Sequence, residues 1–369
     1  MTSGAAADER WMQRACDAAL QGLNTTTPNP RVGCVLVDAH GNMVAEGFHR
    51  KAGEAHAEVD ALNKAGAAAR GCTAYVTLEP CNHQGRTGPC SETLIAAGVT
   101  EVVFGMEDPN PLVSGKGLAR LRAAGVKVRG PILEDQVREL NPGFIQRMTV
   151  GRPWIRCKLA MSLDGRTAMA SGESFWITGE PARADVQQWR ARSCAIVTGI
   201  ASVLKDDPAL TVRDPAFGEN PRQPLRVVVD SRLRTPPEAR LLRMAGSTAI
   251  ATCAFNRPQI GAEIWGMPSI AGAVDLTALV HKLAERGCNE VLVEAGPTLA
   301  GSFLRAGLID ELIVYAAPKL LGSSARPLFD LPLSFMEEAV QLEIVDVCRI
   351  GEDWRFLASV RPAQPQTLM

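Results

Sequence analysis

The sequence predicts two α/β domains in tandem, and three observations support this. The chain has 369 residues, more than one ordinary hydrophobic core accommodates. Short apolar runs typical of buried strands alternate with helical stretches along the whole length, which favours sheets covered by helices. Near the middle, Gly151-Arg152-Pro153 interrupts this pattern. We therefore expect one domain over residues 1–150 and a second over residues 151–369.

The N-terminal elements follow from spacing and turn signals. Apolar residues at helical intervals predict a helix over 8–21 that ends at Gly22, and Pro28-Asn29-Pro30 marks a loop. A turn at His40-Gly41-Asn42 joins two strands, and an alanine-rich stretch predicts the next helix. We expect a three-layer domain with a largely parallel sheet, with strands over 33–37, 43–48, 74–78, 101–106 and 126–128 and further helices over 55–69, 91–97, 117–124 and 135–150.

The second domain has the same alternation, with loop-rich segments at 215–224 and 235–238. We expect strands over 154–161, 195–199, 225–230, 249–253, 290–294, 311–316 and 355–360, and helices over 181–192, 275–286 and 298–306.

Composition excludes several classes of protein. Hydrophobic residues make up 46% and charged residues 21%, so the chain is not globally disordered. The 39 basic and 40 acidic residues leave a net charge of -1, which offers no broad basic face for nucleic acid. There is no apolar run of about 18 residues, and the sequence MTSGAAADER lacks the pattern of a secretory signal. We expect a cytoplasmic protein that binds neither nucleic acid nor membrane.

Two of the ten cysteines stand apart. Cys81 and Cys90 flank a polar loop that contains glycine, and His56 and Glu58 lie on the preceding helix. The remaining cysteines that we assign are expected to be reduced core residues: Cys16, Cys34, Cys157, Cys194, Cys253, Cys288 and Cys348.

One imidazole and two thiolates are typical of a catalytic zinc site, which uses three protein ligands and leaves one position for water. We therefore predict that His56, Cys81 and Cys90 bind zinc, and that Glu58 moves protons without binding the metal. The alternatives are a structural zinc site with His83 as fourth ligand, or a pair of buried thiols. Glu79 is expected to shape the loop.

His-Ala-Glu followed by Pro-Cys and a second Cys resembles the cytidine-deaminase superfamily. Eight residues separate the two cysteines here, where the general signature has two. This longer loop, with Thr27-Pro28-Asn29-Pro30 and Asp108-Pro109-Asn110-Pro111, resembles the deaminase half of the bifunctional riboflavin-biosynthesis deaminase/reductase family. The resemblance continues through segments 158–166, 171–178, 203–213 and 293–301, which are similar to the family's reductase half.

The resemblance implies a cytidine-deaminase-like first domain and a dihydrofolate-reductase-like α/β second domain. It implies one zinc ion, NADPH, a phosphorylated pyrimidine substrate and a homo-oligomer, either a dimer or a tetramer. The expected reactions are hydrolytic deamination of 2,5-diamino-6-(5-phosphoribosylamino)pyrimidin-4-one and NADPH-dependent reduction of its ribosyl group to ribityl. Three alternatives are a monofunctional nucleotide deaminase with a non-catalytic second domain, an RNA-editing deaminase, and a zinc-stabilised structural protein.

The same resemblance assigns further residues. In the first domain, Asn29, His49, His83 and Arg86 would contact substrate, although Asn29 also suits a turn and His49 a solvated strand end. In the second domain, Lys158 and Asp206 would serve the proton steps, and substrate would meet Ser174, Arg190, Leu210, Arg213 and Glu294. The alternatives are surface arginines and a buried Lys158 paired with an acid. The cofactor would meet Ala160, Trp176, Ser202, Asp206, Gly296, Pro297, Thr298, Leu299, Ala300, Gly301 and Ser302. Apart from the resemblance, Ser231 and Arg232 follow the strand over 225–230, and from this position we expect them to meet the cofactor's 2′-phosphate.

Overall fold

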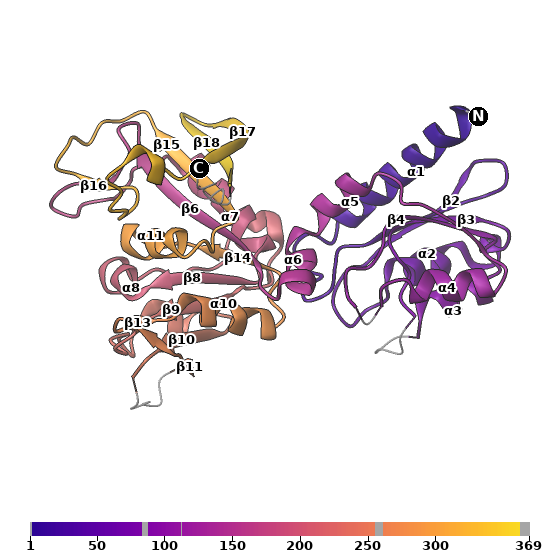
Figure 1. Cartoon of the computed structure of the whole chain (residues 1–369), viewed down its shortest axis with the longest axis horizontal. Helices are drawn as coiled ribbons and strands as arrows, with labels where there is room; N and C mark the ends of the chain where they lie inside the picture. The colour runs from indigo at the N-terminus through magenta and orange to yellow at the C-terminus, as the bar shows by residue number, and fades with distance from the viewer. Residues whose placement is uncertain (1, 83–87, 112, 255–260, 362–369) are drawn as a thin grey trace, which may run out of the picture. The chain divides into compact units, whose positions relative to one another are not determined.

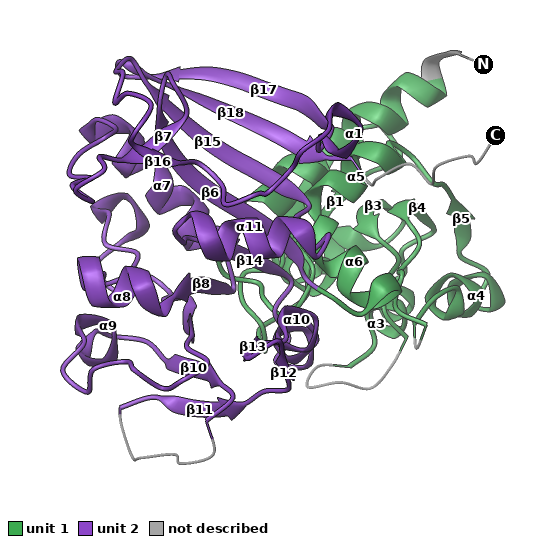
Figure 2. Cartoon of the chain, turned by 60° about the vertical axis from the view of Figure 1, so that its left-hand side comes forward, with its two compact units in different colours: residues 1–152 green, residues 153–369 purple. Residues whose placement is uncertain are grey.

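The computed structural model describes residues 2–82, 88–111, 113–254 and 261–361. It divides into two compact units, residues 1–152 and 153–369 (Figures 1 and 2). Within the described ranges, no helix has both the length and the apolar character that a membrane span needs.

The N-terminal unit is a five-stranded sheet, in the order β2-β1-β3-β4-β5, with helices on both faces (Figure 1). Leu62, Leu94 and Leu121 bring α2, α3 and α4 against one face, and Met12 and Val137 bring α1 and α5 against the other. The predicted three-layer architecture is therefore confirmed. The strands are β1 (Gly33–Val37), β2 (Met43–Phe48), β3 (Thr73–Leu78), β4 (Glu101–Met106) and β5 (Lys127–Arg129); the helices are α1 (Thr2–Leu20), α2 (Ala57–Ala65), α3 (Cys90–Ala96), α4 (Lys116–Ala123), α5 (Glu134–Leu140) and α6 (Pro142–Val150), with a 3-10 turn at Gly66–Ala69.

One prediction for this unit is wrong and another needs refinement. The sheet is mixed, because β1 runs antiparallel to its neighbours β2 and β3, whereas the other four strands point in one direction. The short turn after β1 forces the hairpin, since a parallel crossover needs a dozen or more residues. The expected single helix over 135–150 is two helices, because Pro142 removes a backbone donor and disfavours helical geometry at Asn141, whose φ is -132°.

The C-terminal unit has a nine-stranded sheet in the order β11-β10-β9-β8-β14-β6-β15-β18-β17. The strands from β11 to β15 are parallel, and β18 and β17 add an antiparallel edge. Helices α10 and α11 cover one face, and α7, α8 and α9 cover the other. The main strands are β6 (Trp154–Ser162), β8 (Ala195–Gly199), β9 (Leu225–Val229), β10 (Thr248–Thr252), β11 (Glu263–Gly266), β14 (Glu290–Val293), β15 (Glu311–Ala317), β17 (Leu342–Ile350) and β18 (Asp353–Val360), and the helices are α7 (Glu180–Arg192), α8 (Ile200–Asp206), α9 (Arg240–Arg243), α10 (Leu276–Glu285) and α11 (Pro297–Arg305).

Several short elements were not predicted. Small strand pairs form between β7 (Arg166–Ala168) and β16 (Arg326–Pro327), and between β12 (Ser269–Ile270) and β13 (Ala273–Val274). Short 3-10 turns occur at Pro215–Phe217 and Met336–Glu338. Helices α8 and α9 and strands β11 and β17 were also not predicted.

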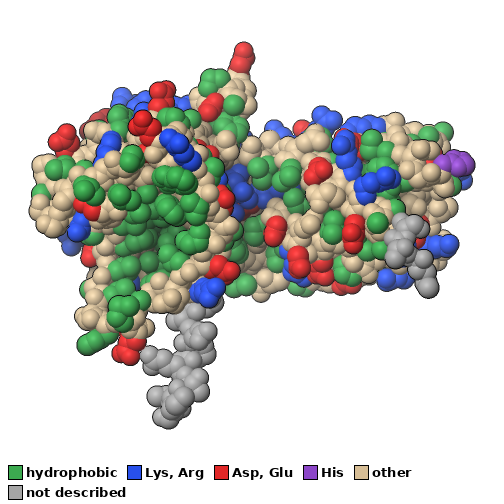
Figure 3. Space-filling model, turned by 90° about the horizontal axis from the view of Figure 1, so that it is seen from above, with side chains coloured by type: hydrophobic (Ala, Val, Ile, Leu, Met, Phe, Trp, Pro, Cys, Tyr) green, Lys and Arg blue, Asp and Glu red, His purple; other side chains and the backbone are tan. Residues whose placement is uncertain are grey.

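Strand β17 is exposed over most of its length. Apolar side chains gather over the surface of the C-terminal unit in Figure 3. On β17, the side chains of Ile344, Val345 and Val347 are 54%, 61% and 45% exposed. This edge strand therefore presents apolar side chains to its surroundings.

All ten cysteines are free. The expectation of buried thiols is confirmed for Cys16, Cys34, Cys157, Cys194 and Cys288. It is wrong for Cys253 and Cys348, which are partly exposed near the sheet edges.

Candidate functional site

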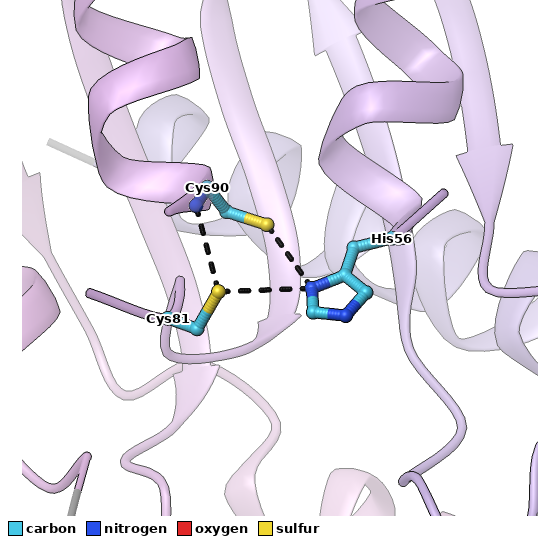
Figure 4. Close-up of side chains that lie close together, drawn as sticks. All are labelled: His56, Cys81 and Cys90. Atoms are coloured by element: carbon cyan, nitrogen blue, oxygen red, sulfur yellow. Dashed lines mark hydrogen bonds between the residues drawn. The ribbon is translucent and has the colours of Figure 1, made fainter. Parts of the chain in front are cut away.

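Three side chains from separate elements of the N-terminal unit converge on one point (Figure 4). His56 is the residue that precedes α2, Cys81 follows β3, and Cys90 is the first residue of α3. The His56 Nδ1 atom lies 3.2 Å from the Cys90 Sγ atom and 3.6 Å from the Cys81 Sγ atom. The parallel packing of β3 and β4 places the loop after β3 at the carboxyl edge of the sheet, where ligands of α/β proteins gather.

These donors fit a zinc ion. Bond lengths of about 2.0 Å to nitrogen and about 2.3 Å to sulfur in tetrahedral geometry separate ligand atoms by about 3.5 Å, which matches the two distances. The three residues form the metal-binding group found among the described residues. His83 and Arg86 lie outside the described residues.

The electrostatics of the cluster favour metal binding. The hydrogen bond from the Cys90 thiol, followed by those from His56 and the Cys90 amide, lowers the pKa of Cys81 to about 4. The same contact and burial raise the pKa of Cys90 in the absence of a metal. One sulfur is thus held as a thiolate, the form that binds metals.

Glu58 is buried on the first turn of α2, two residues after His56. Burial, followed by the charge of Cys81, raises the pKa of its carboxyl to about 7. The group of potential metal ligands consists of His56, Cys81 and Cys90, and Glu58 lies outside it.

A second group of residues adjoins the cluster. The His49 Nδ1 atom lies 2.9 Å from the Ala55 carbonyl, to which it donates, so its Nε2 atom accepts from the Asn29 amide at 3.0 Å. Burial lowers the pKa of His49, which favours this neutral ring. The His49 and His56 rings meet edge to face, with centroids 5.3 Å apart. The alternative of a solvated His49 is therefore wrong, and Asn29, from the loop between two prolines, reaches the same site.

The C-terminal unit contains a separate buried group of charges. Arg190 of α7 makes a bidentate ion pair with Glu294, which follows β14, at 2.6 and 2.9 Å. The charges of Glu294 and Arg190 also act on Lys158 of β6. Burial lowers the pKa of Lys158, the negative charge of Glu294 raises it, and the positive charge of Arg190 lowers it further. Burial and the charge of Arg190 also lower the pKa of Arg213. This group has more positive than negative charge, which suits an anionic ligand.

The neighbouring parallel strands β8, β14 and β9 end at one edge of the sheet. Helix α11 begins there at Pro297 after Gly296, where an added Cβ would meet no atom within 4 Å. Two buried atoms at this edge, Thr198 Oγ1 and Asp230 Oδ1, have no hydrogen-bond partner among the described atoms. An open helix start and unpaired buried polar atoms fit a dinucleotide lying across these strand ends.

Comparison with known proteins covers both units. Residues 5–106 match the family of the cytidine and deoxycytidylate deaminase zinc-binding region, and residues 153–356 match the RibD C-terminal domain. The riboflavin biosynthesis protein RibD of Escherichia coli is 50% identical over 363 residues, which covers 94% of this chain and 97% of that protein. The chain belongs to the RibD family.

Other RibD proteins agree. The protein from Haemophilus influenzae is 47% identical over 93% of this chain and 95% of its own length. A structure of Acinetobacter baumannii RibD superposes with a TM-score of 0.90 at 44% identity and covers 97% of this chain and 100% of that chain. A Thermotoga maritima structure described as a diaminohydroxyphosphoribosylaminopyrimidine deaminase/5-amino-6-(5-phosphoribosylamino)uracil reductase superposes with a TM-score of 0.88 at 32% identity and covers 97% of this chain and 100% of that chain.

The RibD family confirms the predicted fold class, a cytidine-deaminase-like domain followed by a reductase domain. It also confirms that the chain is a riboflavin-biosynthesis enzyme with a deaminase and a reductase domain, and that its cofactors are zinc and NADPH.

The structure places the remaining residues predicted for the RibD reductase domain in different settings. Ser202 lies on the first turns of α8, and exposed Trp176 stacks on Arg183 at 4.4 Å, with Ser174 two residues before it. Asp206 is exposed at the last residue of α8, and the charges acting on Lys158 come from Glu294, Arg190 and Cys157. Three more are buried (Leu210, Ala300 and Gly301), Ala160 is half-buried on β6, and Thr298, Leu299 and Ser302 follow Pro297 along α11.

Two residues position the loops of the RibD deaminase site. The sequence predicted a role in the loop for Glu79, but it did not predict one for Asn141. Glu79 accepts four backbone amides, two of them at 2.9 Å, and so holds the loop that leads into Cys81. Asn141, at the break between α5 and α6, exchanges two 2.8 Å hydrogen bonds with the backbone of Arg31 and fixes the end of the Asn29 loop. The Asn-Pro pair is the only local signal for the second support.

Proposed function

We propose that the N-terminal domain, residues 1–150, deaminates 2,5-diamino-6-(5-phosphoribosylamino)pyrimidin-4-one, and that residues 151–369 reduce the ribosyl group of the product to ribityl. The observation that carries this proposal is the cluster of His56, Cys81 and Cys90 beside buried Glu58, in a chain whose second domain is the RibD reductase.

In the first step, His56, Cys81 and Cys90 would hold zinc. Bound zinc lowers the pKa of a coordinated water from about 16 to about 7 and so provides a nucleophile at neutral pH. Glu58 takes the proton of the attacking water and delivers it to the leaving amine, so that water replaces the ring amine and ammonia departs. Asn29 and His49 orient the pyrimidine, and His83 and Arg86 complete the substrate contacts.

In the second step, bound NADPH would supply the hydride for reduction at the anomeric carbon of the ribosyl group. Arg190 and Arg213 bind the substrate phosphate, and Glu294 holds Arg190 in position. Lys158 and Asp206 serve the proton steps, with Ser174 and Leu210 shaping the substrate site. The cofactor contacts are Ala160, Trp176, Ser202, Ser231 and the segment from Gly296 to Ser302.

A crossed experiment tests both halves. The predicted pyrimidine is incubated with enzyme and NADPH, and ammonia release and NADPH oxidation are read separately. Glu58→Gln should keep zinc and lose ammonia release, but still oxidise NADPH when given the deaminated substrate. Arg190→Ala should show the opposite pattern. Deamination without NADPH oxidation in the wild type would favour a monofunctional deaminase with a non-catalytic second domain.

We further propose that the enzyme is a cytoplasmic homo-oligomer, a dimer or tetramer, that binds neither nucleic acid nor membrane. The exposed apolar side chains of edge strand β17 support a second copy as the partner. Val345→Lys should shift the sedimentation coefficient towards that of the monomer, and an unchanged value would exclude this strand from the interface.

A further inference from the structure

The two cysteines of the metal-binding group lie on segments that come together at the start of α3. Cys81 follows β3 and Cys90 is the first residue of α3, so eight residues separate them. The Cys81 carbonyl accepts the Ser91 amide at 3.2 Å, and the Cys81 Sγ atom accepts the Cys90 amide at 3.5 Å. Both backbone contacts connect the first turn of α3 to Cys81.

Two polar side chains make a third connection between the same segments. The Ser91 hydroxyl donates to the Asn82 Oδ1 atom at 2.8 Å, a normal length for such a bond. Asn82 directly follows Cys81, and Ser91 directly follows Cys90. Ser91 is fully buried and Asn82 is half-buried, so water has little access to the bond. The residue after one sulfur ligand is therefore tied to the residue after the other.

The place of this bond suits a role in holding the metal. A metal ion is released when its ligands move apart, and a bond between the residues that adjoin Cys81 and Cys90 opposes that movement. The bond also closes the loop before zinc binds, so less conformational entropy is lost on binding. The Thr93 hydroxyl of α3 differs, because it donates to the Pro89 carbonyl at 3.1 Å, within the segment that carries Cys90.

We propose that Asn82 and Ser91 form a positioning pair that holds Cys81 and Cys90 at metal-binding distance and slows the loss of zinc from the deaminase site. This inference rests on the proposed zinc ligands. Neither Asn82 nor Ser91 belongs to the metal-binding group, so the pair acts through the two cysteines that it adjoins. When one sulfur withdraws from the metal, the pair keeps its segment close, and the sulfur binds again before the ion escapes.

The test is the rate at which full-length, zinc-loaded protein gives up its metal to an excess of a chromogenic chelator. Ser91→Ala and Asn82→Ala should each speed zinc release by about tenfold. The double variant should also be only about tenfold faster, because both substitutions remove the same bond. Asn82 is half-buried, so Asn82→Ala provides the measurement even where Ser91→Ala fails to fold. The matched control is Thr93→Val, which removes an α3 hydroxyl bonded within its own segment and should leave the rate unchanged.

Several results would overturn the inference. Zinc release at the wild-type rate in Asn82→Ala would show that the pair does not hold the cysteines. A double variant about a hundredfold faster than wild type would show that the two side chains act separately. Equal acceleration in Thr93→Val would assign the effect to the general stability of α3. A wild-type protein that retains no zinc would remove the proposed zinc site itself, and this outcome is distinguished because it is read before any substitution is made.

Discussion

Replacing Glu79 by glutamine should weaken the deaminase domain selectively. Its Oε1 atom accepts the amides of Gly117 and Leu118 at 2.9 and 3.4 Å, and its Oε2 atom accepts those of Gly115 and Asp108 at 2.9 and 3.3 Å. The carboxylate therefore caps the start of α4 from outside the helix, where backbone amides have no partner within the helix.

The magnitude follows from this geometry. Glutamine keeps one oxygen and places an amide donor where the other stood, so one short and one longer bond to a charged acceptor are lost and two backbone donors face another donor. Each bond to a charged group contributes about 1.5–3 kcal/mol, and an unsatisfied buried donor costs about 1–3 kcal/mol. We expect a loss of about 3 kcal/mol, a large fraction of the 5–15 kcal/mol that typically stabilises a domain.

Hydrogen exchange read by mass spectrometry provides the assay. The amides of residues 115–118 should exchange about a hundredfold faster in Glu79→Gln than in wild type, and zinc content and ammonia release should fall. NADPH oxidation with the deaminated substrate should be unchanged. Glu92→Gln is the matched control, because Glu92 pairs with Arg120 at the surface, where an ion pair contributes about 0–1 kcal/mol. Equal exchange in the two variants would refute the reasoning.

Three further predictions concern the same domain. Gly117→Ala places a Cβ 1.8 Å from the Pro80 carbonyl, so it should displace the Cys81 loop and reduce bound zinc, measured by atomic absorption. Removing zinc with a chelator should stop ammonia release and leave the Kd for NADPH unaltered in calorimetry. Burial alone would raise the pKa of Asp8, but hydrogen bonds from Arg129 and Tyr75 outweigh it and hold the pKa below 3.8. The Asp8 carboxylate therefore stabilises the domain above about pH 4 and loses this effect as pH falls further, so thermal melts of Asp8→Asn should differ from wild type at pH 7 and converge with it in acid.

Most of the zinc centre could be predicted from residue types and from their spacing in the sequence. His56 and Glu58 are two residues apart, and Cys81 and Cys90 bracket one loop, so their types and spacing are visible without a fold. The alternation of strands and helices likewise predicted the layers of both units. The short predicted turn at 40–42 requires β1 and β2 to run antiparallel, but the alternation did not predict that β1 also pairs with β3, because that pairing depends on how separate elements pack.

The reductase residues show the limit of local pattern. Arg190 and Glu294 are 104 positions apart and meet because α7 packs over the sheet at the end of β14. Asp206 is similar to a family position by sequence, yet its exposure at the end of α8 follows from how that helix leaves β8. The residues that flank these positions in the sequence predict neither the ion pair between Arg190 and Glu294 nor the exposure of Asp206.

By itself, the sequence determined which atoms are available: an imidazole, two sulfurs and a carboxyl at spacings that suit zinc chemistry, within a chain long enough for two cores. Tertiary structure alone decided which distant groups support them, such as the four amides on Glu79 and the Asn141 side chain that holds the Arg31 backbone. The physical reason is that the sequence specifies the residue type, whereas the packing of separate helices and strands determines which groups a carboxylate contacts.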